Sequence, residues 1–488
     1  MSLLNYIDGR WEAPAIEMDE SVRDASTGEV LFWQRSSTAD QIERALKAAD
    51  AAHASGVWMA MSPQARADKL NAIADEMLGR DHAIAVADAR ATGVIVALTD
   101  KFAQICAGAF RQAAELCLNP PQPTPREGSY GPLAIERLPL GPAAIIAPWN
   151  APSGIAAHKA ASALAAGCPV LLKPSEWAPM SAQLMTEAAA SVGLPNGLWQ
   201  LLHGDGAVGA ALTSDTRVRA VSFTGGLQGG RAVAAACADG IKPAQLELGG
   251  NNPLVVLKDA DLDAAADGVV TALITLNGQW CRALGRLLVH QTVCDALLDR
   301  VRERLATVRL GNAMDAESQM GPLVSQRHHA LVQTHVAQLL AQGGQVLTST
   351  AVPDLPGWFV APTLVTGLDP EQTLEEIFGP VATVHCFESD DEAVHLANQT
   401  PFGLAAYVFG EENHAWSIAN RLRAGLIKLN AVSMLNLHPQ APRPAWGLSG
   451  LGDEGTVETF EFFRGTRVIG VAGRTAVASD TVAEAQAG

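Results

Sequence analysis

Apolar residues first recur with a helical period shortly after residue 38. Ile42, Ala45 and Ala49 fall on one helical face. Thr38 and Gln41 have the spacing of a capping box, in which two side chains satisfy unpaired backbone N–H groups at a helix start. We therefore expect a helix to begin just after Thr38.

Alanine-rich helical patterns continue over residues 64–117. The segment NPPQPTPRE at 119–127 ends them, because proline has no N–H donor and holds φ near one value. Strand-like runs follow at Tyr130–Leu138 and Ala143–Pro148. The prolines therefore mark a boundary between a helical region and a region of strands.

From residue 143 to residue 250, short apolar runs alternate with helical patterns. The runs are AAIIAP, PVLLKP, LWQLL, RAVSFTGG and QLELGG. The helical patterns between them cover 153–166, 179–192, 207–213 and 228–238. This alternation predicts an α/β fold with a doubly wound, Rossmann-like parallel sheet, whose strand ends form a binding site for a dinucleotide.

A second α/β region is expected over residues 252–447. Its helical patterns lie near 261–277, 291–307 and 324–342, and TVHCFE is typical of one of its strands. The residues from 473 to 488 are small and polar and show no period, so we expect a disordered tail there.

The composition limits the classes of protein to which the chain can belong. At 488 residues it has room for about three domains. The net charge of −17 argues against nucleic acid or an anionic membrane as a partner. The most apolar region, 141–172, is interrupted by prolines and by Asn150, His158 and Lys159, so we expect no membrane span.

The N-terminus carries Asp8 and Glu12 where a signal peptide would need an apolar run. The seven cysteines form no CxxC pair, and no histidine cluster has the spacing of metal ligands. These features favour a reducing compartment over a disulfide framework. We expect a cytoplasmic protein with no metal site.

Two reactive side chains stand near the middle of the chain, beside small residues. Glu247 and Cys281 are 281 − 247 = 34 residues apart, and Gly249 and Gly250 leave room for a ligand. A thiolate can add to a carbonyl carbon, and a carboxylate can take a proton from a thiol or from water. A free cysteine is more often buried packing than a nucleophile, so the spacing alone leaves both interpretations open.

LELGG and the downstream GQWC together resemble the paired signature of the aldehyde dehydrogenase superfamily, and further matches extend to about Val471. The resemblance implies an NAD-binding domain, a catalytic domain and a small β oligomerisation extension. The implied boundaries are 1–119 and 140–248 for the NAD-binding domain, 249–447 for the catalytic domain, and 120–139 and 448–472 for oligomerisation or bridging segments.

The resemblance also implies a mechanism that needs no metal. Cys281 would attack the aldehyde carbon, while Asn150 in APWN and the Cys281 backbone N–H would bind the oxyanion. Hydride transfer to the nicotinamide would leave a thioester. Glu247 would then activate the water that hydrolyses this thioester to a carboxylic acid.

VLLKPSEWAP resembles the segment with which the family holds the adenosine ribose, through Lys173 and Glu176. A carboxylate accepts hydrogen bonds from both ribose hydroxyls and repels a 2′-phosphate, so NAD is favoured and NADP is the alternative. In SFTGGLQGG, Gly226 stands where the family often has a serine, so one hydroxyl contact is lost. The other implied cofactor residues are Trp149, Gly206, Phe223, Thr224, Gly225, Gly230, Glu376 and Phe378.

GDGAVG at 204–209 matches the pattern GxGxxG. No acidic residue lies near 224–226, where the ordinary dinucleotide fingerprint has its ribose partner. The glycines can equally start a helix without a ligand. The resemblance places this loop, with Gly206, near the adenine.

The resemblance identifies the residues beside the nucleophile and after Asn150 as the lining of the substrate tunnel: Ala151, Ile155, His158, Trp280 and Arg282. Arg282 favours a small anionic semialdehyde, because a guanidinium pairs bidentately with a carboxylate. The alternatives are a structural ion pair of Arg282 and an aromatic aldehyde over the Trp280 ring. Gly447 stands where the family usually has a lysine, so this substrate-side loop is altered.

Three further predictions concern release of the product and assembly. Family members that transfer the acyl group to coenzyme A typically lack the carboxylate of Glu247, so its presence favours water. A non-catalytic relative is disfavoured, because Cys281, Glu247 and Asn150 are all retained. Tyr130–Leu138 and Thr466–Val471 resemble the segments that extend sheets between subunits, so we expect a homodimer or homotetramer.

Overall fold

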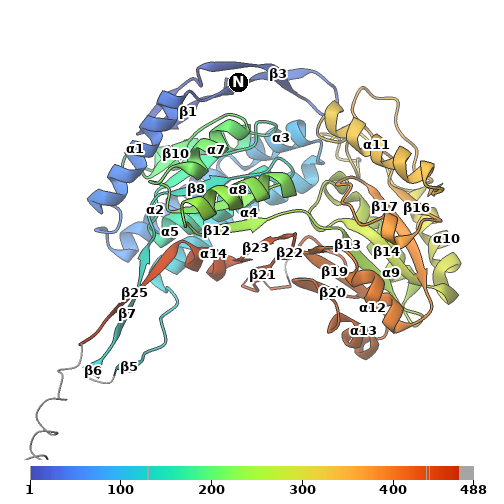
Figure 1. Cartoon of the computed structure of the whole chain (residues 1–488). Coiled ribbons are helices and arrows are strands. Elements are labelled where there is room, and N and C mark those ends of the chain that lie inside the picture. The colour runs from blue at the N-terminus through green and yellow to red at the C-terminus, as the bar shows by residue number, and fades with distance from the viewer. Residues whose placement is uncertain (1, 129–130, 436, 439, 472–488) are drawn as a thin grey trace, which may run out of the picture.

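The computed structural model describes residues 2–128, 131–435, 437, 438 and 440–471. Two largely parallel sheets, each covered by helices, lie side by side, and a two-stranded ribbon extends away from the first (Figure 1). The predicted α/β fold with a doubly wound sheet is confirmed. The predicted tail and Tyr130 lie outside the described residues.

The first sheet has eight strands. Their order is β2 (Arg10–Glu12), β1 (Asn5–Ile7), β10 (Trp199–Leu201), β9 (Val170–Lys173), β8 (Ala143–Ile146), β11 (Ala220–Thr224), β12 (Ala244–Glu247) and β23 (Gly450–Leu451). The strands from β10 to β12 pair in parallel. β23 pairs antiparallel with β12, so the C-terminal segment also supplies an edge strand to this sheet.

Helices bury both faces of the first sheet. One face carries α2 (Pro63–Leu78), α3 (Asp81–Thr92), α4 (Val96–Leu118), α5 (Pro152–Ala166) and α6 (Met180–Ser191), and the other carries α1 (Ala39–Ser55), α7 (Gly206–Ser214) and α8 (Leu227–Asp239). Ala143 and Ile145 of β8 belong to the first core, whereas Ala144 and Ile146 belong to the second. Successive side chains of a strand point to opposite faces, so β8 is apolar throughout.

The second sheet has seven strands. Their order is β15 (Gln345–Leu347), β16 (Thr363–Thr366), β17 (Val381–Phe387), β14 (Leu284–His290), β13 (Asn252–Val256), β19 (Ala405–Phe409) and β20 (Leu426–Leu429). β15 runs antiparallel to β16, and the other neighbours pair in parallel. Its helices are α9 (Leu262–Ile274), α10 (Cys294–Leu305), α11 (Gln326–Ala341), α12 (Asp390–Asn398) and α13 (Glu412–Ala419).

The ribbon pairs β7 (Ala134–Pro139) antiparallel with β25 (Arg464–Ile469), close to the short helix α14 (Thr456–Phe462) (Figure 1). The two segments predicted to extend sheets between subunits are therefore paired with each other within the chain. Three smaller pairs are β5 (Glu127–Gly128) with β6 (Gly131–Pro132), β18 (Phe402–Gly403) with β22 (Trp446–Gly447), and β21 (Arg443–Pro444) with β24 (Asp453–Glu454).

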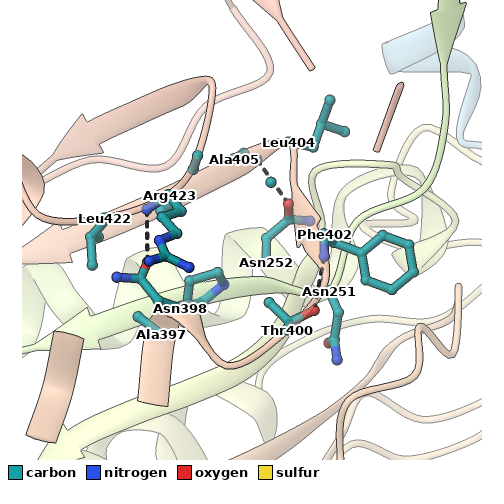
Figure 2. Close-up of a pocket in the computed structure, with 14 residues that line it drawn as sticks. Asn251, Asn252, Ala397, Asn398, Thr400, Phe402, Leu404, Ala405, Leu422 and Arg423 are labelled. Atoms are coloured by element: carbon teal, nitrogen blue, oxygen red, sulfur yellow. Dashed lines mark hydrogen bonds between the residues drawn. The ribbon is translucent and has the colours of Figure 1, made fainter. Parts of the chain in front are cut away.

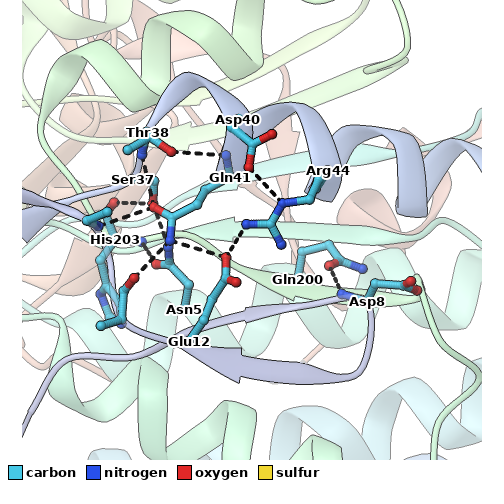
Figure 3. Close-up of polar contacts among 12 residues, drawn as sticks. Asn5, Asp8, Glu12, Ser37, Thr38, Asp40, Gln41, Arg44, Gln200 and His203 are labelled. Atoms are coloured by element: carbon cyan, nitrogen blue, oxygen red, sulfur yellow. Dashed lines mark hydrogen bonds and ion pairs between the residues drawn. The ribbon is translucent and has the colours of Figure 1, made fainter.

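The predicted capping box at the start of α1 is confirmed. The Thr38 hydroxyl accepts from the Gln41 N–H (3.2 Å), and the Gln41 amide oxygen accepts from the Thr38 N–H (3.0 Å). Gln41 also donates to Glu12 in β2 (3.2 Å), so the cap ties this helix to the sheet edge (Figure 3). In the chain, α1 comes directly after an outer hairpin that is formed by β3 (Ile16–Arg23) and β4 (Val30–Ser36).

No helix in the described part of the chain has both the length and the apolar composition needed to cross a bilayer.

Candidate active site

The carboxyl ends of four neighbouring strands of the first sheet meet along one edge. β8 leads into Trp149 and Asn150, β9 ends at Lys173, β11 at Thr224 and β12 at Glu247. They surround a cavity of about 360 Å³. Parallel strands carry their carboxyl ends at one edge, which is where open α/β sheets bind ligands. Other predicted site residues lining this cavity are Ile155, Glu176, Phe223, Gly225, Gly226, Cys281, Glu376 and Phe378.

A left-handed stretch of backbone directly precedes the predicted nucleophile. In the 3₁₀ turn η1 (Thr275–Gly278), φ is +58° at Asn277 and +71° at Gly278. A Cβ on Gly278 would lie 2.2 Å from the Pro380 nitrogen, so only glycine fits there. The Asn277 side chain donates to the Pro322 carbonyl (2.8 Å). These contacts hold an otherwise unfavourable turn and fix where the chain enters the cavity.

Asn252, the first residue of β13, holds the peptide that follows the predicted nucleophile. Its Nδ2 donates to the carbonyls of Cys281 (2.9 Å) and Ala283 (2.8 Å). Its amide oxygen accepts from the Ala405 N–H (3.0 Å), as Figure 2 shows. With all three bonds made, the Cys281 backbone is fixed against the second sheet. The sequence analysis did not single out Asn252.

The predicted oxyanion donor, Asn150, is also held in place. Its Nδ2 donates to the Gln279 carbonyl (2.9 Å), and the Gln279 side chain accepts from the Val324 N–H (2.9 Å). Asn150 and Gln279 are both buried. An amide group carries two N–H donors, so one bond to Gln279 leaves the second N–H for a ligand oxygen.

The thiol and the carboxylate influence each other strongly. Burial raises the pKa of Cys281 well above its usual value, the charge of Glu247 raises it further, and Arg282 opposes both. Burial raises the pKa of Glu247 too, with a further contribution from Glu454. The thiol and the carboxyl group are close enough for each to shift the pKa of the other. Cys281 therefore rests as a thiol beside a carboxyl group that can act as a base.

A buried ion pair lies within electrostatic reach of Glu247. Lys159 of α5 and Glu454 of β24 approach to 2.7 Å, and the Lys159 side chain is fully buried. Sequence reasoning missed both residues, because 454 − 159 = 295 residues separate them and neither belongs to a local pattern. A paired lysine and glutamate change the local field without adding net charge.

The predicted ribose residues occupy the end of the cavity formed by β9. Lys173 and Glu176 form an ion pair at 3.4 Å. Burial lowers the pKa of Lys173, and Glu176 and Asp205 act in the opposite direction. Asp205 comes from the GDGAVG loop, where its side chain caps α7. Two acidic residues from different loops, Glu176 and Asp205, therefore lie near Lys173, although none lies at 224–226.

The turn that follows β11 contains a buried hydroxyl without a hydrogen-bond partner among the described residues, and two glycines. The Thr224 hydroxyl is buried and has no hydrogen-bond partner among the described residues. A Cβ on Gly225 would lie 2.7 Å from the Phe223 ring, and the Gly226 that follows is the N-cap of α8. An orphaned hydroxyl, small residues and a helix start are the features with which a diphosphate is bound, so these residues fit a dinucleotide.

Glu376 lies against the glycine pair that follows β12. Its Oε1 accepts from the Gly250 N–H (2.9 Å), and a Cβ on Gly249 would lie 1.9 Å from its Oε2. Burial raises the pKa of Glu376 to about 7. Gly249 therefore leaves room for the carboxyl group of Glu376, and Gly250 leaves room for the Asn252 side chain.

Phe378 is held in a left-handed conformation, with φ at +53°. Its carbonyl accepts a hydrogen bond from His328 (2.8 Å). The Trp149 ring meets the Phe378 ring edge-on, with centroids 5.5 Å apart. The two aromatic residues predicted to lie beside the cofactor therefore pack together.

Six of the predicted residues do not line the cavity, namely Gly206, Gly230, Ala151, His158, Trp280 and Arg282. Gly206 is exposed at the start of α7, and Gly230 is buried inside α8 against a leucine. His158 accepts a hydrogen bond from Arg443 (3.1 Å) and also contacts the Thr459 hydroxyl (3.1 Å). Burial lowers the pKa of His158 to about 3. His158 is therefore a neutral residue that contacts the C-terminal segment, and its role in a substrate tunnel stays a prediction.

The other predicted substrate residues lie on either side of Cys281. Ala151 and Trp280 belong to an apolar cluster with Cys281 that also contains Val94, Leu98, Phe102, Leu276, Ala283, Val432 and Met434. Arg282 is partly buried, and its Nε has no hydrogen-bond partner in the described part of the chain. The neighbouring cation Lys428 donates to the Ser433 and Leu435 carbonyls. Burial, together with the charge of Arg282, lowers the pKa of Lys428 to about 8.

Comparison with known proteins agrees with this geometry. The family model described as the aldehyde dehydrogenase family matches residues 11–469. The chain is 33% identical to glutarate-semialdehyde dehydrogenase of Pseudomonas aeruginosa, over 92% of this chain and 94% of the relative. It is 37% identical to a betaine aldehyde dehydrogenase of Cereibacter sphaeroides, over 92% and 93%.

Solved structures give the same result. Betaine aldehyde dehydrogenase of Staphylococcus aureus in complex with NAD+ superimposes with a TM-score of 0.91 and 31% identity, covering 96% of this chain and 95% of that one. The chain therefore belongs to the aldehyde dehydrogenase family, a family of oxidoreductases.

Proposed function

We propose that this protein oxidises an aldehyde to a carboxylic acid with NAD, through a thioester on Cys281. The observation that carries the proposal is the convergence of Cys281, Glu247 and Asn150 on the cavity that Lys173 and Glu176 also line. The NAD complex of the staphylococcal relative supports the choice of cofactor. The carboxylates of Glu176 and Asp205 near Lys173 support NAD over NADP, because both would repel a 2′-phosphate.

The first step is the attack of Cys281 on the aldehyde. The Cys281 thiol loses its proton to solvent, and the positive charge of Arg282 favours the resulting thiolate. The thiolate adds to the aldehyde carbon and makes the carbonyl oxygen an anion. The free N–H of Asn150 and the Cys281 backbone N–H donate to this oxygen. Such donors each contribute about 3–4 kcal/mol to the transition state.

The second step releases the acid. When NAD is bound, it accepts the hydride of the former aldehyde C–H, which leaves a thioester on Cys281. Glu247 removes a proton from water, and the hydroxide attacks the thioester carbon. The Cys281 thiolate leaves and takes up the proton that Glu247 removed from water, so the site returns to its resting state. Lys173, Glu176, Thr224, Glu376 and Phe378 would hold the cofactor.

Reduction of NAD by the purified protein tests the proposed function. The absorbance of NADH should rise when aliphatic, aromatic or carboxylated aldehydes are added. A free carboxylic acid should form without coenzyme A. A requirement for coenzyme A would favour the acylating alternative. No NADH with any aldehyde, despite NAD binding, would indicate a non-catalytic relative.

The Nε of Arg282, which has no hydrogen-bond partner among the described residues, supports an anionic semialdehyde as the substrate. A buried guanidinium nitrogen without a hydrogen bond is unfavourable, and a substrate carboxylate could pair with the guanidinium bidentately. The other nearby cations already have partners, since Lys428 is bonded to two carbonyls and Arg443 contacts His158. The name of the glutarate-semialdehyde relative describes an aldehyde that carries a carboxylate.

Replacing Arg282 with alanine is expected to remove a preference for acidic substrates. Wild type should oxidise a short semialdehyde better than its uncharged analogue, by ~1.5–3 kcal/mol in kcat/KM, the scale of a charged hydrogen bond. Arg282→Ala should oxidise the two equally, while Arg282→Lys should keep part of the preference. Equal kcat/KM for both substrates in wild type would refute the anionic assignment.

An aromatic aldehyde is the second candidate substrate. The apolar cluster around Cys281, with Trp280, Phe102 and Met434, supports it because such side chains favour an uncharged ring. A wild-type preference for benzaldehyde-type substrates, unchanged in Arg282→Ala, would select this candidate.

The ribbon of β7 and β25 supports the predicted homo-oligomer. Val468, Ile469 and Val471 are 59%, 50% and 69% exposed, which leaves an apolar strand uncovered in one chain. Light scattering should therefore give a dimer or tetramer at micromolar concentration. Val468→Lys with Ile469→Lys should shift it towards the monomer, because lysines on a covered strand lose solvation. A monomeric wild type would contradict this prediction.

A further inference from the structure

Two cysteines outside the active-site cavity lie in direct contact. Cys294 is the first residue of α10, and Cys386 is the residue before the last of β17. Their Sγ atoms are 2.7 Å apart, although 386 − 294 = 92 residues separate them in the sequence. A disulfide has an S–S length of about 2.05 Å, so the two sulfurs need only a small movement to bond.

The two thiols differ in exposure. Cys386 is exposed, whereas Cys294 is buried beneath it. The hydrogen bond that Cys386 shares with Cys294 lowers the pKa of Cys386 to about 7, although burial and the nearby Asp295 oppose the shift. The other cysteines of the chain lack this combination, since Cys106, Cys117, Cys168 and Cys237 are buried. An exposed thiolate with a second thiol in contact is the arrangement of a redox-reactive pair.

The pair lies at the ends of strands that begin near the active site. β14 begins shortly after Cys281, β17 begins shortly after Phe378, and these strands pair in parallel. Cys386 is in register with Val289, the residue before the last of β14. The thiols therefore lie at the edge of the second sheet that faces away from the catalytic residues, and neither lines the cavity.

We propose that Cys294 and Cys386 form a reversible disulfide that oxidises before the active-site thiol and ties the start of α10 to the end of β17. A low-molecular-weight disulfide such as oxidised glutathione supplies the oxidant. The Cys386 thiolate attacks one of its sulfurs and expels one thiolate. Cys294 then attacks the Cys386 sulfur and expels the second. One S–S bond breaks and one forms, and the protons of the two cysteines go to the two released thiols.

Reaction at Cys386 precedes reaction at Cys281 for two physical reasons. Cys281 is only partly exposed, and burial and Glu247 hold its pKa well above the usual value, so little thiolate is present. Thiol–disulfide exchange proceeds through the thiolate and needs access to the attacking sulfur. The active-site nucleophile therefore remains reduced while the surface pair is consumed.

The experiment uses the full-length protein in buffers of rising oxidised-to-reduced glutathione ratio. Remaining thiols are alkylated, and a non-reducing digest is analysed by mass spectrometry. We expect a cross-linked peptide joining Cys294 to Cys386 at ratios where Cys281 is still alkylated. Glutathione left on Cys386 without a cross-link, or modification of Cys281 first, would overturn the proposal.

Two variants serve as controls for this assignment. Cys386→Ser, an exposed and conservative change, should abolish the cross-link, whereas Cys237→Ser, which alters a cysteine outside the pair, should keep it. Oxidation should raise the apparent thermal midpoint of wild type by roughly 4 °C, because a loop of this length loses entropy when closed. The midpoint of Cys386→Ser should not rise. If oxidation leaves the thermal midpoint of wild type unchanged, the result would contradict a disulfide that ties α10 to β17.

Discussion

Replacing Cys281 with serine is expected to lower aldehyde turnover by more than about 10⁴-fold, the scale found when a covalent nucleophile is removed. A serine hydroxyl ionises far less readily than a thiol, and nothing in this site lowers its pKa enough to compensate. Steady-state NADH formation measures the loss. Folding and NAD binding should persist, because the contacts of Asn252 with this segment involve the Cys281 backbone and not its side chain.

The control for this variant is Cys237→Ser, which should keep wild-type turnover because α8 holds this cysteine away from the cavity lining. Isothermal titration should give the same affinity for NAD in both variants. Substantial dehydrogenase activity in Cys281→Ser would mean that another cysteine is the nucleophile.

Replacing Glu247 with glutamine is expected to slow release of the acid by roughly 10²–10⁴-fold, the contribution of a general base. Hydride transfer should slow less. The charge of Glu247 raises the pKa of Cys281, so its removal makes the thiolate easier to form and offsets the loss of a nearby base. Stopped-flow kinetics should therefore give a burst of NADH followed by a slow steady phase.

The pH dependence follows from the same carboxyl group. Burial, with repulsion from Glu454, raises the pKa of Glu247, and only its ionised form can take a proton from water. In wild type, thioester hydrolysis should therefore fall as the pH drops through this raised pKa, and Glu247→Gln should lose that dependence. Equal slowing of the burst and the steady phase would mean that Glu247 activates the thiol.

The fold was accessible from the sequence because it depends on local patterns. The capping box at Thr38 and the helical period over 153–166 appear in the structure as the start of α1 and as α5. β8 and β9 are apolar on both faces, which distinguishes buried parallel strands. Such features involve only a few neighbouring residues, so these helices and strands can be predicted without knowing which elements pack against them.

The contacts that hold the site residues in place could not be predicted in this way. Asn252 reaches Cys281 across 29 residues, and Asn150 reaches Gln279 across 129. Asp205 was overlooked because the usual fingerprint places its acid after the next strand. These contacts depend on how separate loops meet at the sheet edge. The left-handed turn before Gln279 likewise depends on Pro380, which belongs to another strand connection.

The thioester itself is the most direct test of the catalytic proposal. Glu247→Gln should be mixed with NAD and an aldehyde that the wild type oxidises, quenched in acid during the slow phase, digested and analysed by mass spectrometry. The account predicts an acyl group on Cys281 in an amount that matches the NADH burst. A burst without an acyl group, or an acyl group on a different cysteine, would contradict it.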